Sequence, residues 1–195
     1  MELMRRRREI IGLSRSVLPS EYQQLEYIKT PSTGILSKNY NAFICTGIPY
    51  NGIGKIVCKY GVFTYTDGNA PIILAAYASG TTTVANPFVA INGASSSVSG
   101  LIISPIAQSP YGGTLNEYTI ICSSTSNNNL RIGGWSDGAW TADGAYYYVD
   151  VYDKNNELMA KFLPCYRKAD DVAGLYDIVG NEFYSSAGSE EFQKP

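Results

Sequence analysis

The chain has 195 residues and no histidine, so imidazole metal ligands, Ser-His-Asp triads and Cys-His pairs are excluded. A formal net charge of -2 gives no global reason to bind nucleic acid or an anionic membrane. The low charged fraction (16%), the 19 glycines and the 16 tyrosines favour short strands joined by tight turns, and we expect one all-β domain.

The first segment, residues 1–17, is basic and lacks aromatic residues. It carries four consecutive arginines and a nearby apolar pair: Arg5, Arg6, Arg7, Arg8, Ile10 and Ile11. The arginines would repel one another in an isolated helix, so they need an acidic partner or bulk water. We expect an arm that docks in a carboxylate-lined groove of another protein; a frayed end or a nucleic-acid contact are the alternatives. The apolar stretch 10–13 is too short for a signal peptide, and no apolar run is long enough for a transmembrane helix.

From residue 18 onward, short apolar runs alternate with turn residues, which indicates β-strands. The expected strands cover residues 22–28, 42–48, 55–66, 72–77, 88–91, 101–103, 118–122, 130–133, 146–152, 158–163, 174–179 and 182–185. Asn and Gly at 153–156 and 180–181 tolerate the positive φ of hairpin turns, so the C-terminal third should be an antiparallel meander.

Residues 146–152 show the alternation of a half-buried strand. The alternation predicts two faces, with Tyr147, Val149 and Val151 on one and Tyr146, Tyr148, Asp150 and Tyr152 on the other.

The four cysteines, Cys45, Cys58, Cys122 and Cys165, lie far apart in the sequence, and none belongs to a close pair of the kind that zinc sites use. Each lies in or beside an apolar run. We therefore expect reduced, buried thiols.

Two stretches at opposite ends of the chain carry a family resemblance. The first is LPSEYQQLEYI at 18–28, and the second combines FLPCYRK at 162–168, GLYDI at 174–178 and EFY at 182–184. Together with TGI at 46–48, they resemble the concanavalin A-like (laminin-G-like) jelly-roll domains of phage and prophage proteins from gut bacteria. The resemblance implies a two-sheet antiparallel jelly-roll sandwich over residues 18–195, preceded by the short N-terminal arm of residues 1–17.

The resemblance also implies a function. Members of this family lie in virion or cell-surface proteins, so the chain is expected to be a non-enzymatic virion component, such as a head fibre, a capsid decoration protein or a tail-fibre piece. It would assemble in the bacterial host cytoplasm and display a lectin-like domain, with host-surface glycan adhesion as one role. The alternative is a free-standing bacterial carbohydrate-binding lectin.

The physical interpretation of the C-terminal motif is structural. Five of its residues are expected to fill the space between two sheets and its margins: Leu163, Cys165, Leu175, Tyr176 and Phe183. We also considered an ion pair between Arg167 and Asp177 across neighbouring strands.

Some glycosidases share the sandwich fold, and they need two carboxylates about 5 to 9 Å apart. Asp150 and Asp153 are three residues apart and so face opposite sides of a strand, while Asp170 and Asp171 are adjacent and diverge. The E-x-D-x-E type of pattern is absent. We expect no catalytic residues and no enzyme activity.

Glycan binding is the stronger hypothesis for a site, because sugars stack on aromatic faces and bind planar amides and carboxylates. A Gly-rich loop at 133–140 supplies Trp135, Asp137 and Trp140, which Tyr111 and Asn116 of a second loop could join. Alternatively, the tryptophans pack on the sandwich edge or in a subunit contact.

No metal and no cofactor is expected. Asp137 and Asp143 could contribute to a calcium site, but no dense acidic loop is present. The expected partners are other virion proteins, a host-surface glycan, and further copies of the chain in a cyclic homo-oligomer, for which a trimer is one possibility. The many tyrosines and the low charge density motivate the last of these. Neither nucleic acid nor a membrane is expected as a partner.

Overall fold

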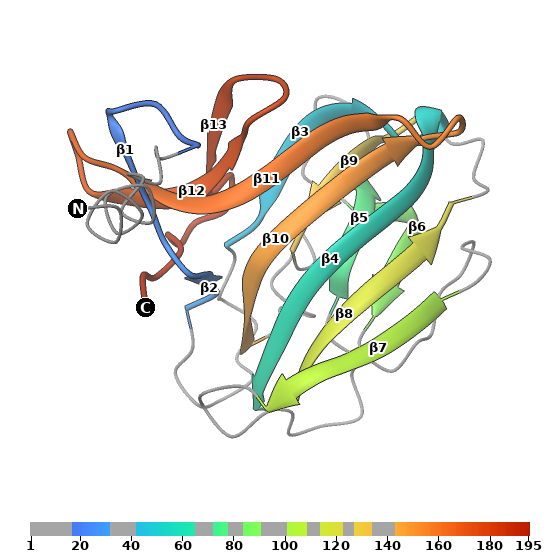
Figure 1. The fold of residues 1–195 in the computed structure, drawn as a ribbon, viewed down its shortest axis with the longest axis horizontal. Coiled ribbons are helices and arrows are strands. Elements are labelled where there is room, and N and C mark those ends of the chain that lie inside the picture. The colour runs from blue at the N-terminus through green and yellow to red at the C-terminus, as the bar shows by residue number, and fades with distance from the viewer. Residues whose placement is uncertain are drawn as a thin grey trace, which may run out of the picture.

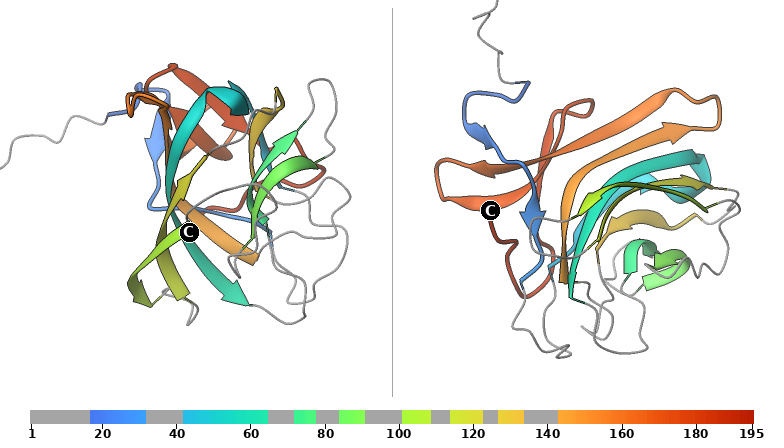
Figure 2. Two further views of the ribbon diagram at one scale, coloured as in Figure 1. Left: turned by 90° about the vertical axis from the view of Figure 1, so that its right-hand side faces the viewer. Right: turned by 60° about the horizontal axis from the view of Figure 1, so that its bottom comes forward.

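A computed structural model describes residues 17–31, 42–64, 72–77, 84–90, 101–108, 114–122, 127–133 and 143–195. The described residues form two antiparallel sheets that face each other as a sandwich (Figure 1, Figure 2). The all-β, two-sheet antiparallel class predicted from the sequence is therefore confirmed. None of these residues lies in a helix with the length and hydropathy of a transmembrane segment.

The larger sheet, sheet A, contains nine strands: β1 (Tyr22–Gln24), β2 (Ile28–Lys29), β4 (Ile53–Thr64), β7 (Leu101–Gln108), β8 (Thr114–Ile121), β10 (Asp143–Asp153), β11 (Leu158–Arg167), β12 (Val172–Asp177) and β13 (Glu182–Ser185). Sheet B contains four: β3 (Ile44–Pro49), β5 (Ile72–Tyr77), β6 (Val84–Ala90) and β9 (Asn129–Ile132). A 3-10 helix, η1 (Tyr50–Gly52), joins β3 to β4. The strand order is β13-β12-β11-β10-β4-β8-β7 in sheet A and β3-β9-β5-β6 in sheet B.

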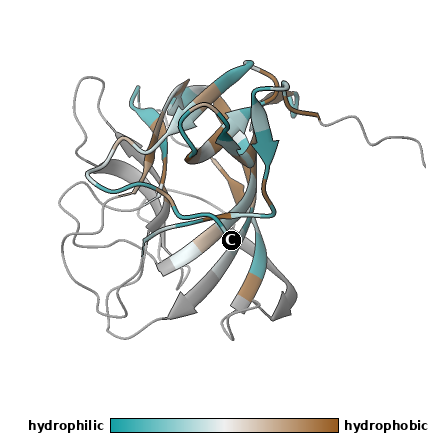
Figure 3. Cartoon of the chain, turned by 90° about the vertical axis from the view of Figure 1, so that its left-hand side faces the viewer, coloured by the Kyte–Doolittle hydropathy of each residue, from teal (hydrophilic) through white to brown (hydrophobic). Residues whose placement is uncertain are grey.

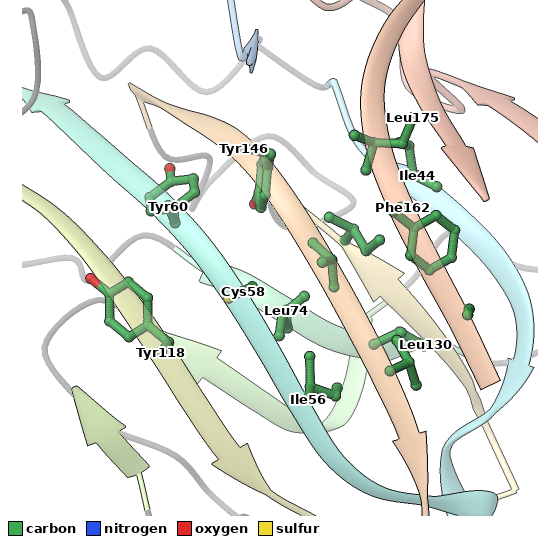
Figure 4. Packing of buried hydrophobic residues seen from close by; sticks show 14 of the residues in the cluster. Ile44, Ile56, Cys58, Tyr60, Leu74, Tyr118, Leu130, Tyr146, Phe162 and Leu175 are labelled. Atoms are coloured by element: carbon green, nitrogen blue, oxygen red, sulfur yellow. The ribbon is translucent and has the colours of Figure 1, made fainter. Parts of the chain in front are cut away.

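The core fills the space between the sheets. Apolar residues at every second position of the strands point inward, and they come from both sheets: Ile44, Leu74, Leu130 and Ile132 from sheet B, and Ile56, Cys58, Val149, Val151, Phe162 and Leu175 from sheet A (Figure 4). Full burial of one such aliphatic or aromatic side chain stabilises the fold by about 1.5–3 kcal/mol. The period-two pattern of the sequence therefore decides which face of each strand enters the core.

The facing prediction for β10 is partly wrong. Val149 and Val151 face the core as expected, but Tyr146 joins them there, whereas Tyr147 packs on the outside of sheet A. The pairing of β10 with β4 shifts register between Tyr146 and Tyr148. This bulge inserts one extra residue, and so it inverts the alternation on its N-terminal side.

The C-terminal third is the antiparallel meander that the turns predict. Strands β10 to β13 are neighbours in chain order. Asn156 and Asn181 have positive φ in the first and the third of the three hairpin turns, as their residue type allows. Hydrophilic and hydrophobic bands alternate along the strands on this side of the molecule (Figure 3).

The N-terminal strap, residues 18–30, is built into sheet A. Its β1 pairs with the second half of β11, and its β2 pairs with the start of β10. The strap thus lies between the first half of β10 and the second half of β11, where these two strands no longer pair with each other (Figure 1). On its other side, Lys29 exchanges both backbone hydrogen bonds with Gln193, each at 2.8 Å.

The two stretches that carry the family resemblance meet at this strap. Tyr22 lies 4.8 Å from Tyr176 and 5.2 Å from Phe183 between ring centroids. With Leu18, Leu163 and Cys165 they form a cluster on the outer side of sheet A. The framework roles predicted for the C-terminal motif are confirmed in part: of the five named residues only Leu175 reaches the core between the sheets, and the other four pack in this outer cluster.

The considered ion pair between Arg167 and Asp177 does not form. In the register of β11 with β12, Arg167 lies opposite Val172, while Asp177 lies opposite Phe162 at the other end. Arg167 instead pairs with Asp170 at 2.6 Å. Asp177 accepts hydrogen bonds from the backbone N–H groups of Lys161 and Val179 and so holds the β12–β13 turn.

The expected strands all exist, but several are longer than predicted. β5 and β13 have the predicted bounds, whereas β7, β8 and β11 extend beyond them, and the stretch 22–28 is divided into β1 and β2. Residues 1–16, and with them nearly all of the predicted arm, lie outside the described residues.

The four cysteines are thiols, three buried and one, Cys45, half-buried. Burial raises the pKa of Cys58 well above its usual range, that of Cys122 to about 11 and that of Cys165 to about 12. Because the thiolate is the reactive form, buried protonated thiols react slowly.

We therefore expect a disulfide-exchange reagent at pH 8 to titrate one cysteine of the native protein quickly, and all four after denaturation without reductant. A Cys45→Ser variant should remove the fast phase. Fewer than four thiols in the denatured chain, or two or more fast thiols in the native one, would contradict this assignment.

Candidate functional site

The outer face of sheet A presents rows of polar and aromatic side chains. Strand register places residues of neighbouring strands side by side: Tyr148 of β10 lies opposite Lys59 of β4, which lies opposite Glu117 of β8. One row further along, Lys161 of β11 lies opposite Asp150 of β10. We call these five residues the Tyr148 patch.

The Tyr148 side chain bridges three strands. Its hydroxyl donates a hydrogen bond to Glu117 Oε2 across the intervening strand β4. Adjacent strands lie about 4.8 Å apart, so the backbones of β10 and β8 are roughly 10 Å apart. A tyrosine reaches a glutamate over that span only if its ring runs along the sheet instead of standing upright. Burial and the Glu117 carboxylate hold the pKa of Tyr148 well above its usual range, so the hydroxyl stays a donor.

Asp150 lies beside this ring and is only 9% exposed. Its Oδ2 pairs with Lys161 Nζ at 3.1 Å. Its Oδ1 is buried and has no hydrogen-bond partner among the described residues. A buried carboxylate oxygen without a donor is costly, and it is found where water or a ligand supplies the missing hydrogen bond.

Lysines lie over the neighbouring tyrosine rings of this face. Lys59 Nζ lies 4.7 Å from the centroid of the Tyr147 ring, and Lys55 Nζ lies 4.1 Å from that of Tyr152. Such cation–π contacts hold ring and ammonium together. Lys161 Nζ lies further from the Tyr148 ring, at 5.9 Å.

Of the five residues predicted to bind a glycan, four lie outside the described residues: Tyr111, Trp135, Asp137 and Trp140. The strand ends that flank their loops can be compared. β8 begins at Thr114 and β10 begins at Asp143. Strand β4 lies between them, and its Gly61 is opposite both Leu115 and Ala145, so the first residues of β8 and β10 lie at the same end of β4. Both loops therefore join sheet A at the same end.

Asn116, the fifth residue, does not lie in a loop. It belongs to β8, opposite Tyr60, and its amide donates a hydrogen bond to the Tyr118 hydroxyl at 3.3 Å. Tyr60 and Tyr118 belong to the core, so Asn116 shares their inward face. The prediction of a loop position is wrong because β8 begins four residues before the expected start at 118.

The six residues assigned to the assembly anchor, Arg5, Arg6, Arg7, Arg8, Ile10 and Ile11, also lie outside the described residues. Their role stays a prediction.

Asp153 has a structural role. Its Oδ1 accepts hydrogen bonds from the backbone N–H groups of Asn155 and Glu157, both at 2.8 Å, and these bonds hold the β10–β11 turn. Asp150 and Glu117 do share a face, but they come from different strands, so the spacing of acidic residues along one strand does not reveal the pair. Both are engaged, Glu117 by Tyr148 and Asp150 by Lys161.

Among the described residues, no three Cys, Asp or Glu side chains gather as a metal site would require. Of the two considered calcium ligands, Asp143 begins β10 and Asp137 lies outside the described residues.

The sequence signal for the Tyr148 patch is the spacing Leu115, Glu117, Thr119, which puts a carboxylate on one face of β8. The partners of that carboxylate come from other strands, so they depend on the register of the sheet and cannot be seen in the local sequence.

No protein-family model, curated protein or solved structure matches the chain.

Proposed function

We propose that this chain is a non-enzymatic structural protein of a phage virion, such as a head fibre, a capsid decoration protein or a tail-fibre component. In this proposal the arm of residues 1–17 attaches the chain to other virion proteins, and a lectin-like jelly-roll sandwich is displayed outward for adhesion to host-surface glycans. Self-association as a cyclic homo-oligomer is part of the proposal.

One observation supports it most: the chain that follows the basic arm passes directly into sheet A. The strap forms β1 and β2 between β11 and β10, and Lys29 is bonded to Gln193 on its other side. A load on the arm would therefore reach the centre of the sandwich through several hydrogen-bonded strands, which suits a displayed domain.

A second candidate is a free-standing bacterial lectin. The half-buried, polar and aromatic face around Tyr148 favours it, because glycan binding needs no particle. A genome neighbourhood without phage genes, together with saturable glycan binding by a monomer, would favour this lectin over the virion protein.

The arm is tested in the particle. Two variants are compared with the full chain: Arg5 to Arg8 all changed to Ser, and Ile10 with Ile11 changed to Ser. We expect each variant to be incorporated about tenfold less than the full chain or worse. The arginine variant leaves carboxylates of the groove without a partner, which costs several kcal/mol, and the isoleucine variant loses the burial of two apolar side chains.

Lys154→Ser, an exposed change in the β10–β11 turn, is the control and should be incorporated normally. Normal incorporation of both arm variants would show that the arm is a frayed end. A steep loss of arm binding with salt, in the presence of DNA, would instead identify nucleic acid as its partner.

A further inference from the structure

We propose that the Tyr148 patch binds an extended, neutral polysaccharide that lies across strands β11, β10, β4 and β8. The inference deepens the glycan-adhesion part of the proposed function and rests on it. It assigns the binding to a face of sheet A instead of to the Trp-containing loop.

The first argument is the vacant acceptor. Asp150 Oδ1 is buried and has no donor among the described residues, while its other oxygen is held by Lys161. A ligand atom that completes this site must donate a hydrogen bond. Sugar hydroxyls do so, whereas phosphate, sulfate and carboxylate groups would place a second negative charge beside Asp150.

The second argument is the fixed ring. The hydrogen bond to Glu117 holds Tyr148 along the sheet, so the end of its ring is fixed in place. Sugar C–H faces pack against aromatic rings of this kind, because the ring offers a flat apolar surface with a polar edge. Tyr148 is half-buried, and the fixed ring loses little side-chain entropy on binding.

The third argument is local charge balance. The patch contains two lysines and two carboxylates, and the carboxylates are bonded to Lys161 and to Tyr148. No net charge is left to attract an ionic ligand. The patch crosses four adjacent strands, a span of about 14 Å, which suits an oligosaccharide stretch better than a single sugar.

The test is affinity electrophoresis of the purified full chain in gels that contain dextran, laminarin, mannan or xylan, with polygalacturonate as an acidic polymer. We expect at least one neutral polymer to retard the protein and polygalacturonate not to. Tyr148→Ala should weaken the retardation about tenfold or more, and Asp150→Asn should weaken it by at least about threefold.

Two control variants match these changes. Tyr166→Ala removes a half-buried tyrosine that also has a lysine over its ring, but from the inward side of β11. Asp171→Asn removes an exposed carboxylate at a positive φ that Asn tolerates. Both should bind as the unchanged chain does, and slow labelling of the three buried cysteines verifies that each variant is folded.

The outcomes separate the two proposals. Retardation that survives both Tyr148→Ala and Asp150→Asn overturns the patch and leaves glycan adhesion to another surface. No retardation by any neutral polymer overturns both the patch and glycan adhesion, while incorporation into the particle is measured independently. Retardation by polygalacturonate alone also overturns the patch as described.

Discussion

Arg131→Ala should lower the free energy of unfolding by about 3–5 kcal/mol, because it leaves a cavity in place of a large, fully buried side chain. Arg131 lies in β9 at the centre of sheet B, opposite Cys45 of β3 and Ala75 of β5. Its side chain is 0% exposed, and its guanidinium lies 3.4 Å from the centroid of the Phe43 ring. Urea denaturation monitored by circular dichroism measures the effect.

Two further variants define the cause. Arg131→Lys should also destabilise the fold, because an ammonium does not reproduce the planar stacking of a guanidinium. Arg167→Ala, which breaks the exposed pair with Asp170, should cost at most about 1 kcal/mol. An Arg131→Ala variant as stable as Arg167→Ala would show that the buried arginine does not hold sheet B together.

Raising the pH above 9 should unfold the protein progressively. Burial raises the pKa of Cys122 from 9.0 to about 11 and that of Cys165 from 9.0 to about 12, and it raises those of Tyr50 and Tyr146 well above 10.0. The native state then holds these protons more tightly than the unfolded chain. Their contribution is complete below the unfolded pKa values and is lost as the pH rises through the folded ones.

The size of the effect follows from the shifts. A rise of about two pKa units at Cys122 corresponds to about 3 kcal/mol, most of it lost between pH 9 and 11. Unfolding free energies at pH 7, 9, 10 and 11 test this, and Cys122→Ala should flatten part of the slope. Constant stability up to pH 11 would mean that these groups ionise without unfolding.

The sequence predicts the elements better than their arrangement. The strands and hairpin turns depend on local patterns, such as the apolar run of β5 or asparagine at Asn156 and Asn181, and the sequence predicts them correctly. The bulge at Tyr147 cannot be predicted from the local sequence, because it arises from a shift in the register of β10 against β4. The strap between β10 and β11 likewise depends on contacts between residues more than 100 positions apart.

The candidate sites show the same division. The sequence predicts a glycan site in a loop rich in Trp, Gly and Asp, because the composition of a loop can be judged from the sequence alone. The Tyr148 patch joins side chains from four strands and becomes apparent only with the register of the sheet. The burial of Arg131 cannot be predicted from the sequence, because a charged residue between Leu130 and Ile132 is normally expected on a solvated face.

The most direct test of the proposed function is a map by electron microscopy of phage particles from the bacterium that carries the gene, with mass spectrometry of the same particles. We expect a fixed copy number of the chain in each particle. The map should show the sandwich on the outside, joined to a neighbouring virion protein through residues 1–17. Particles purified to constant composition that lack the chain would contradict the account.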